Sequence, residues 1–202
     1  MYKIIFKRLF DILISFVALL VLSPIMLMII ILLLFFNKGS GVFFKQTRTG
    51  KNLTLFKIYK FKTMADTKDA SGKLLPDEER TSGLGRLLRT TSMDELPQFL
   101  NVFFGQMSLI GPRPLLEKYI PLYSQEQTRR HEVKPGISGW AQCNGRNAIT
   151  WSEKFKLDVW YVDNISFVTD IKIIIFTIKN VVQRKDITSS DSIKFEPFNG
   201  NN

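Results

Sequence analysis

The longest apolar segment of the chain is a charge-free run over residues 12–36, and Ser23-Pro24 lies at its centre. About twenty apolar residues in a helix can cross a bilayer core of roughly 30 Å. A proline inside a helix lacks an N–H and clashes with the carbonyl four residues earlier, so it kinks or breaks the helix. Each half would then be about twelve residues, or roughly 18 Å, long. The pattern predicts a re-entrant helix-break-helix that enters and leaves the membrane on one side, with a kinked transmembrane span as the alternative.

The segments after this run predict a β-hairpin followed by a loop. Residues 42–48 and 53–64 are rich in Val, Phe, Tyr, Ile and Thr, and turn-forming residues at 49–52 separate them. Residues 65–85 are polar, with several Asp, Gly and Pro. We expect them to form a loop with little regular structure.

Helical spacing and capping signals follow in the second half of the chain. They predict helices over residues 84–89, 92–104, 115–130 with a kink at Pro121, 150–162 and 166–185. Ser92 with Glu95 and Thr150 with Glu153 match the capping box. The wide apolar stripe of residues 166–185 fits a core helix or an in-plane membrane helix, and we expect it to serve as both.

The predicted fold is α+β and mainly helical, with a re-entrant membrane helix broken at Ser-Pro, a small β-hairpin and in-plane amphipathic helices. The expected division is a membrane segment at 1–38, a catalytic domain at 39–187 and a flexible tail at 188–202. Residues 133–145 are expected to form a loop with a short strand.

The distribution of charge indicates on which side of the membrane the flanks of the apolar run lie. The chain has 202 residues and a formal net charge of +10. Basic residues flank the apolar run on both sides: Lys3, Lys7 and Arg8 before it, and Lys38, Lys45, Arg48, Lys51, Lys57, Lys60 and Lys62 after it. Positive flanks mark the cytoplasmic side, and a simple span should show asymmetry, so these residues leave a monotopic re-entrant helix and a kinked span as alternatives. The charge suits anionic headgroups or a phosphorylated substrate, and nucleic acid is not an expected partner.

Cysteine and histidine usage excludes several classes of protein. The single cysteine, Cys143, allows no internal disulfide and suits a reducing compartment, where it is expected to be a small buried hydrophobe. The single histidine, His131, argues against a zinc enzyme and a serine triad, and is expected at the surface or in a loop. The apolar run is too long for a cleaved signal peptide.

Candidate chemistry gathers around Asp94-Glu95, which is placed at a predicted helix start. Such a pair usually caps a helix, but here Arg89, Lys60 and Arg113 are expected nearby, and two prolines stiffen the loop around Arg113. A carboxylate among basic groups stays ionised, can bind Mg²⁺ and can attack phosphorus. These parts fit phosphoryl transfer at a membrane surface.

Several motifs in order resemble those of the bacterial sugar transferase family, the monotopic phosphoglycosyl transferases, in a minimal form. They are KIYKFKTM at 57–64, SMDELPQ at 92–98, MSLIGPRP at 107–114, KPGISGWAQ at 134–142 and NGRN at 144–147, after the Ser-Pro of the apolar run. The resemblance covers nearly the whole chain. It implies transfer of a phospho-sugar from a UDP-sugar to undecaprenyl or another polyprenyl phosphate, with release of UMP, at the start of bacterial glycoconjugate synthesis.

The resemblance also implies roles for individual residues. Asp94 would attack the β-phosphorus and carry a covalent phospho-sugar, while Glu95 would move a proton or help to hold Mg²⁺, the implied cofactor. The remaining implied substrate- and phosphate-binding residues are Lys60, Arg89, Arg113, Arg146 and Asp170, with the uridine end as an alternative for Arg146 and a helix-capping role for Asp170. Ser23 and Pro24 would form the re-entrant turn at the cytoplasmic face of the inner membrane.

Two other functions remain open at this point. One is a catalytically silent membrane scaffold for later glycosyltransferases, against which the intact dyad argues. The other is an anchored enzyme that joins sugars without a phosphate, which the lack of an Asp-x-Asp motif disfavours. An N-acetylated UDP-sugar is the favoured donor by resemblance, and self-association or later glycosyltransferases of the pathway are the further candidate partners.

Overall fold

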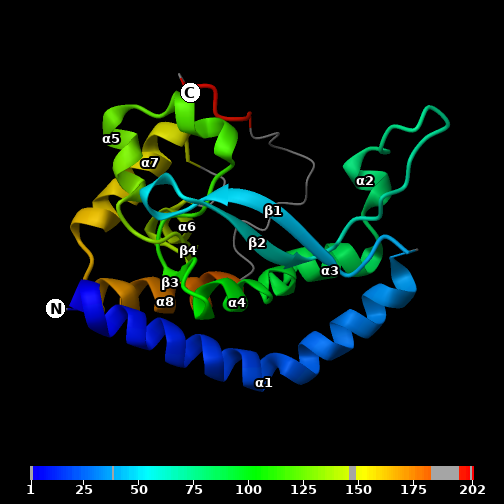
Figure 1. Ribbon diagram of the computed structural model, residues 1–202, viewed down its shortest axis with the longest axis horizontal. Helices are drawn as coiled ribbons and strands as arrows, with labels where there is room; N and C mark the ends of the chain where they lie inside the picture. Colours follow the sequence, from blue (N-terminus) through cyan, green and yellow to red (C-terminus); the bar gives the residue numbers. More distant parts are fainter. Residues whose placement is uncertain (1, 38, 146–148, 183–195, 201) are drawn as a thin grey trace.

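The computed structural model describes residues 2–37, 39–145, 149–182, 196–200 and 202. Figure 1 shows one long curved helix, α1 (Lys7–Phe36), running beneath the other elements, with α4 (Gln98–Phe103) and α8 (Phe167–Val182) lying above it. The hairpin of β1 (Phe43–Thr49) and β2 (Leu55–Phe61) lies above these helices. The predicted α+β, mainly helical fold with a small hairpin and an apolar N-terminal helix is confirmed.

The remaining elements are short. The helices are η1 (Tyr2–Phe6), η2 (Lys51–Leu53), α2 (Asp77–Arg80), α3 (Gly83–Thr90), η3 (Met93–Glu95), η4 (Glu117–Leu122), α5 (Gln125–Thr128), η5 (Arg129–His131), α6 (Trp140–Asn144) and α7 (Trp151–Asp163). A second sheet pairs β3 (Ser108–Ile110) with β4 (Gly136–Ser138) in parallel, in the register Ser108 to Gly136. The strand expected within residues 133–145 is therefore β4, whereas β3 was not predicted.

Helix α1 runs through Pro24 without a break and is visibly bent in Figure 1. The predicted break in the helix is therefore wrong: the helix is bent but continuous. Proline leaves the carbonyl of Leu20 without its helical donor, and the hydroxyl of Ser23 donates to that carbonyl at 2.7 Å. Among the described residues, α1 is the one helix long and apolar enough to cross a membrane.

The two ends of α1 are tied to the rest of the molecule. Near its start, Arg8 donates to the carbonyls of Val102 and Phe103 at 2.7 and 2.8 Å. Near its end, Leu33 belongs to an apolar core cluster, and the Asn37 amide donates to two backbone carbonyls. The middle of the helix is largely exposed; its exposed apolar residues are Phe16, Val17, Leu20, Val21, Ile25, Leu27 and Met28.

The predicted hairpin is confirmed, with β1 and β2 antiparallel and Thr49 opposite Leu55. Alternate residues of a strand share one face, so Gln46 and Arg48 lie on the same face of β1. Phe44 is paired with Lys60, which places the Lys60 side chain on this face too. The hairpin therefore presents a row of polar side chains from two strands to one side.

The middle of the chain agrees with its prediction in one part and differs in another. Residues 65–82 have little regular structure, as expected; they contain the four-residue helix α2 and the isolated bridges Met64 to Thr81 and Lys68 to Leu74. Acidic residues in the first turn of α2 suit the helix dipole and favour this helix. The predicted helix over 115–130 is divided into η4, α5 and η5.

The capping box at Thr150 and Glu153 is confirmed, and it opens α7. Ser166 accepts a hydrogen bond from the Thr169 amide at 3.1 Å before α8. The predicted last turn of this helix, residues 183–185, lies outside the described residues.

His131 and Phe198, near the C-terminus, are more buried than predicted. His131 is 5% exposed and its ring contacts the Gly50 carbonyl, so its expected surface position is wrong. Phe198, in the segment expected to be loose, is 3% exposed and packs against Tyr119 and Phe155. Cys143 is partly buried beside Thr177.

Candidate active site

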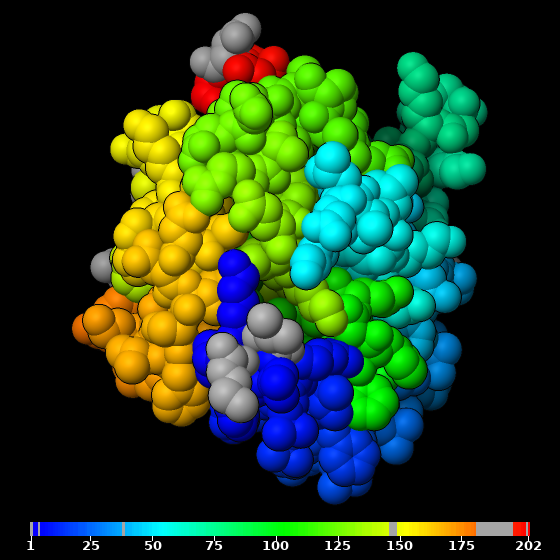
Figure 2. All heavy atoms as spheres, turned by 60° about the vertical axis from the view of Figure 1, so that its left-hand side comes forward, coloured from blue at the N-terminus to red at the C-terminus, as the bar shows by residue number. Residues whose placement is uncertain are grey.

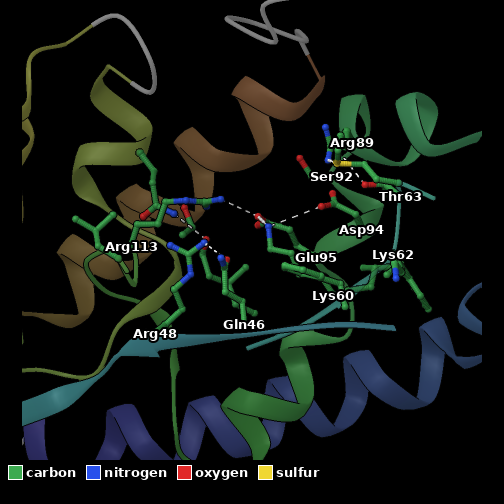
Figure 3. Close-up of a pocket in the computed structure, with 18 of the residues that line it drawn as sticks. Gln46, Arg48, Lys60, Lys62, Thr63, Arg89, Ser92, Asp94, Glu95 and Arg113 are labelled. Carbon is green, nitrogen blue, oxygen red and sulfur yellow. Dashed lines mark hydrogen bonds and ion pairs between the residues drawn. The ribbon is translucent and has the colours of Figure 1, made fainter. Parts of the chain in front are cut away.

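A cleft of about 1080 Å³ lies between the hairpin, α3, the segment around η3 and helices α6, α7 and α8. Figure 3 shows charged side chains converging on it from several of these elements. Of the predicted site residues, Lys60, Arg89, Asp94, Glu95 and Arg113 all line the cleft. These five come from four separate stretches of the sequence, which the fold has brought together.

Glu95 is the most heavily paired acid in the cleft. Its Oε1 accepts from Lys60 Nζ at 2.6 Å and from Arg113 Nη2 at 2.9 Å, and the side chain is 17% exposed. Burial favours its neutral form, but the charges of Arg113 and Lys60 outweigh burial, so the pKa of Glu95 falls to about 2. Glu95 is therefore ionised at any physiological pH, as predicted.

Asp94 has a different environment, although it precedes Glu95 directly. Its side chain is 13% exposed and its nearest cation, Lys60 Nζ, lies 3.7 Å from Oδ2. Burial raises the pKa of Asp94 above its usual range and the charge of Glu95 adds to this, whereas Lys60 opposes it. The two adjacent carboxylates thus differ in basicity. Asp94 is the more basic, and it has fewer close ion-pair partners among the described residues.

The local backbone explains why both acids are available. Ser92 adopts a left-handed conformation with φ 57°, and its side chain does not cap the following turn. The predicted capping box of Ser92 and Glu95 is therefore wrong. Asp94 and Glu95 lie in the single turn η3, and α4 begins only after Pro97. Because Glu95 does not cap a helix, its carboxylate is free to bind the cleft cations.

Arg89 reaches the cleft from α3. Its Nε donates to Thr63 Oγ1 at 2.9 Å, which holds the guanidinium near Asp94, as Figure 3 shows. Gly85 allows this placement, because a Cβ there would lie 2.0 Å from the Thr63 carbonyl oxygen. Helix α3 can therefore pack directly on the chain that follows β2.

The backbone of Arg113 is fixed by two residues that the sequence analysis missed. Its carbonyl accepts from Arg130 Nη2 at 2.7 Å, and Arg130 forms a buried ion pair with Asp158 at 2.8 Å. Asp158 lies on the apolar face of α7, between Phe155 and Val159 in the buried set. An acid on a buried stripe was the signal that could have indicated a buried partner.

Gln46 and Arg48 also line the cleft and were not among the predicted site residues. Arg48 appeared only in the list of basic flanking residues. The alternation of β1, which places both side chains on the face shared with Lys60, was the available signal.

Two predicted site residues are not brought to the cleft. Asp170 is 4% exposed and accepts from Lys7, Tyr2 and Tyr161, so its assignment to the phosphate pocket is wrong. In Figure 2 the first turns of the chain (blue) lie beside α8 (orange), the helix that carries Asp170. Arg146 lies outside the described residues.

The donor set fits a divalent cation only when phosphate contributes ligands. Among the described residues no three His, Cys, Asp or Glu side chains gather in one group. Asp94 and Glu95 supply two carboxylates, and Mg²⁺ is commonly held by one or two carboxylates together with substrate phosphates. Both cations bind Glu95 through Oε1, which leaves Oε2 without a cation among the described residues.

Comparison with known proteins gives the family. The family model described as "Bacterial sugar transferase" matches residues 2–184. An "Uncharacterized sugar transferase EpsL" of Bacillus subtilis (strain 168) is 52% identical, over 97% of this chain and 96% of that protein. The UDP-glucose:undecaprenyl-phosphate glucose-1-phosphate transferase of Klebsiella pneumoniae is 38% identical, over 87% of this chain and 40% of that protein.

A third relative acts on a different sugar. The UDP-N-acetylgalactosamine-undecaprenyl-phosphate N-acetylgalactosaminephosphotransferase of Aeromonas hydrophila is 37% identical, over 87% of this chain and 43% of that protein. The names of the Klebsiella and Aeromonas relatives thus share undecaprenyl phosphate and differ in the sugar. With a family model over nearly its whole length, the chain belongs to the bacterial sugar transferase family.

Proposed function

We propose that this protein moves a phospho-sugar from a UDP-sugar to undecaprenyl phosphate, or another polyprenyl phosphate, and releases UMP. This would be the first membrane step in the synthesis of a bacterial glycoconjugate. Support comes from the cleft, which combines an acidic dyad with Lys60, Arg89 and Arg113. Further support comes from relatives whose names specify transfer of a sugar phosphate to undecaprenyl phosphate.

The observation that carries this proposal is the unequal pairing of the two acids. Glu95 binds two cations directly, whereas among the described residues Asp94 forms an ion pair only with Lys60, at 3.7 Å. A carboxylate that is not neutralised by a close partner, and whose pKa is raised, is the better nucleophile of the two. We therefore assign nucleophilic attack to Asp94 and a positioning role to Glu95.

The proposed reaction has two steps. An Asp94 oxygen bonds to the β-phosphorus of the UDP-sugar, and the bond from that phosphorus to the bridging oxygen breaks, so its electron pair leaves with UMP. An oxygen of the polyprenyl phosphate then bonds to the same phosphorus, and the Asp94 carboxylate departs. Both nucleophiles are anionic, so neither step needs a histidine base.

The cations of the cleft would hold the phosphates. Glu95 fixes Lys60 and Arg113 beside the reaction centre, and Arg130 fixes the Arg113 backbone. Mg²⁺, held by Asp94 or Glu95 and by phosphate oxygens, would neutralise charge on the diphosphate and its leaving group. The protein's own part is to orient the phosphates and to hold Glu95 ionised.

We further propose that α1 dips into the cytoplasmic leaflet and returns. Its two ends are tied to the globular part, its exposed middle is apolar, and both flanks are basic. Helix α8 adds exposed apolar residues: Phe167, Val168, Ile171, Ile175 and Ile178. This arrangement would hold the cleft at the depth of the acceptor phosphate. Labelling of cysteines placed at each terminus would test it, since both should react from the same side.

One assay tests the proposed activity. The detergent-solubilised protein is incubated with a panel of UDP-sugars, Mg²⁺ and undecaprenyl phosphate, and the released nucleotide is identified. Release of UMP supports phospho-sugar transfer, and release of UDP would instead indicate direct sugar transfer. No release from a broad panel would favour a silent scaffold. Asp94→Asn serves as the control for release by a contaminating enzyme.

A further inference from the structure

Arg48 is a cleft cation with no acidic partner among the described residues. Its Nη2 donates to Gln46 Oε1 at 2.6 Å and its Nη1 to the Pro114 carbonyl at 3.4 Å. Both acceptors are neutral, and the buried Nε of Arg48 has no hydrogen-bond partner in the part of the chain that the structure describes. The guanidinium is therefore oriented by the protein, but no described acid pairs with it.

The surroundings of Arg48 make this imbalance unfavourable. Burial lowers the pKa of Arg48, and the charge of Arg113 lowers it further. Arg113 has Glu95 as its partner at 2.9 Å, so that acid is already shared between Arg113 and Lys60. A buried charge without a counter-ion costs free energy, and an anionic ligand that enters the cleft would remove this cost.

The position of Arg48 limits which anion this is. In Figure 3 Arg48 and Arg113 lie on the opposite side of Glu95 from Asp94. A phosphate group bound beside Arg48 would therefore be a different group from the one whose phosphorus Asp94 attacks.

We propose that Arg48 and Arg113 form a phosphate subsite in which Arg48, oriented by Gln46, binds a phosphate group that is not transferred. A guanidinium presents paired donors to phosphate oxygens, so the chemistry of the ligand is that of a phosphate mono- or diester. This inference rests on the proposed function, which supplies two such groups: the phosphate that leaves as UMP and the phosphate of the polyprenyl acceptor.

The test compares the full-length wild type with Arg48→Gln and Arg48→Lys. Lys57→Gln is the matched control, because it removes one positive charge from the same hairpin and Lys57 does not line the cleft. For each protein, the KM for the donor and for undecaprenyl phosphate is measured by UMP release. Calorimetric titration with UMP gives its Kd, and thermal unfolding is followed with and without UMP.

The subsite predicts a clear separation between these variants. Loss of one charge-assisted contact in Arg48→Gln should weaken phosphate binding at least roughly tenfold. Arg48→Lys should lie between that variant and the wild type, and Lys57→Gln should stay within about twofold of the wild type. Unfolding of unliganded Arg48→Gln should not be easier, because the variant removes an uncompensated charge.

The two sources of phosphate give different results. A rise in the UMP Kd and the donor KM identifies the nucleotide phosphate, and a rise in the acceptor KM alone identifies the lipid phosphate. Unchanged KM and Kd values in Arg48→Gln would overturn the inference, whatever happens to kcat. A wild type that releases no UMP would instead overturn the proposed function.

A second variant guards against misfolding of Arg48→Gln. Gln46→Glu keeps Arg48 in place and gives it a carboxylate at the position of the present Oε1 contact. The new acid should compete with phosphate and raise the same KM or Kd as Arg48→Gln. If Gln46→Glu folds and binds both substrates like the wild type, Arg48 does not bind phosphate.

Discussion

The cleft and the first turn of α8 each contain a buried acid beside a lysine, Asp94 and Asp170, yet only Asp94 is suited to chemistry. In the first turn of α8, Asp170 uses both oxygens: Oδ2 accepts from Tyr2 at 2.6 Å and Lys7 at 2.7 Å, and Oδ1 accepts from Tyr161 at 2.7 Å. In the cleft, Asp94 has a single ion-pair partner among the described residues, Lys60 at 3.7 Å. Burial alone therefore does not distinguish an anchoring acid from a reactive one.

The two acids differ in how many of their carboxylate oxygens can still accept a hydrogen bond and in whether a ligand can reach them. Asp170 has its oxygens fully engaged and joins the start of α1 to α8, so it stabilises the fold. Asp94 keeps its oxygens available in an open cleft because Glu95 binds the nearby cations in its place. An acid that is bound by several donors, as Asp170 is, anchors the structure. An acid whose neighbour binds the nearby cations, as Asp94 is, can react.

The largest expected effect is that of Asp94→Asn. The variant should lower UMP release by at least about 10³-fold, because an amide cannot form the acyl phosphate. Its unfolding midpoint should match the wild type, since the described partner of Asp94, Lys60, lies 3.7 Å away. Activity within tenfold of the wild type would show that the comparison assigns the wrong acid, and thermal unfolding in detergent is the control for folding.

Glu95→Gln should have the next largest effect. The substitution leaves Lys60 and Arg113 without their anion, and both cations would turn to Asp94 and occupy it. We expect UMP release to fall about 100-fold, the range for losing one preorganised electrostatic partner. Single-turnover UMP release measures this directly. A variant that retains a third of the wild-type rate would argue that Glu95 does not protect Asp94.

Asp170→Asn should affect stability instead of chemistry. It leaves Lys7 without its acid in a partly buried position, so the free energy of unfolding should fall by about 3 kcal/mol. The activity of the folded fraction should remain. Asp163→Asn, which removes an exposed partner of Arg129, is the control and should cost under about 1 kcal/mol. Lost activity with unchanged stability would contradict the anchoring role.

The pH dependence of UMP release should report Asp94 and not Glu95. The pKa of Asp94 is raised, so activity should begin to fall at a higher pH than an ordinary aspartate would give, by about tenfold for each unit below that pKa. The pKa of Glu95 is lowered to about 2, so its contribution to stability is present above pH 4.5 and is lost as the pH falls toward 2.

Measurements on two variants separate these contributions. Glu95→Gln should lack the part of the acid-induced loss of stability that falls between pH 4.5 and 2, and denaturant unfolding at several pH values measures it. A wild-type activity profile that is flat down to pH 4 would be inconsistent with Asp94 as the ionised nucleophile with a raised pKa.

The smallest expected effect is that of Tyr161→Phe. It removes the single phenolic O–H, which donates to Asp170 Oδ1 at 2.7 Å and has the Ile110 carbonyl as a second acceptor at 3.2 Å, while Lys7 and Tyr2 still bind Oδ2. The free energy of unfolding should fall by about 1 kcal/mol and the activity should not change. A loss as large as that of Asp170→Asn would mean that the two oxygens act as one unit.

Much of the fold could be read from local patterns. The hairpin at 42–64, the helix after Thr150 and the apolar helix around Pro24 each have a signal within a few residues, and each is present. The capping box predicted at Ser92 is absent because the chain enters η3 through a left-handed residue, and Glu95 pairs with Lys60 and Arg113 instead.

The candidate site was predictable only in part. Motifs gave Lys60, Asp94 and Arg113, which the fold does bring to one cleft. Asp170 was misplaced because a motif position does not reveal that Lys7, distant in sequence, pairs with it. The buried stripe of α7 and the alternation of β1 indicated where Asp158 and Arg48 lie, but only the folded arrangement shows which of these charges have partners.

The central claim is that Asp94 transiently carries a phospho-sugar. The most direct measurement is intact-protein and peptide mass spectrometry after incubation with a UDP-sugar and Mg²⁺ without a lipid acceptor. The account predicts a mass increase equal to one sugar phosphate on the peptide that contains Asp94, and its disappearance when undecaprenyl phosphate is added. Release of UMP with no adduct, or with the adduct on Glu95, would contradict it.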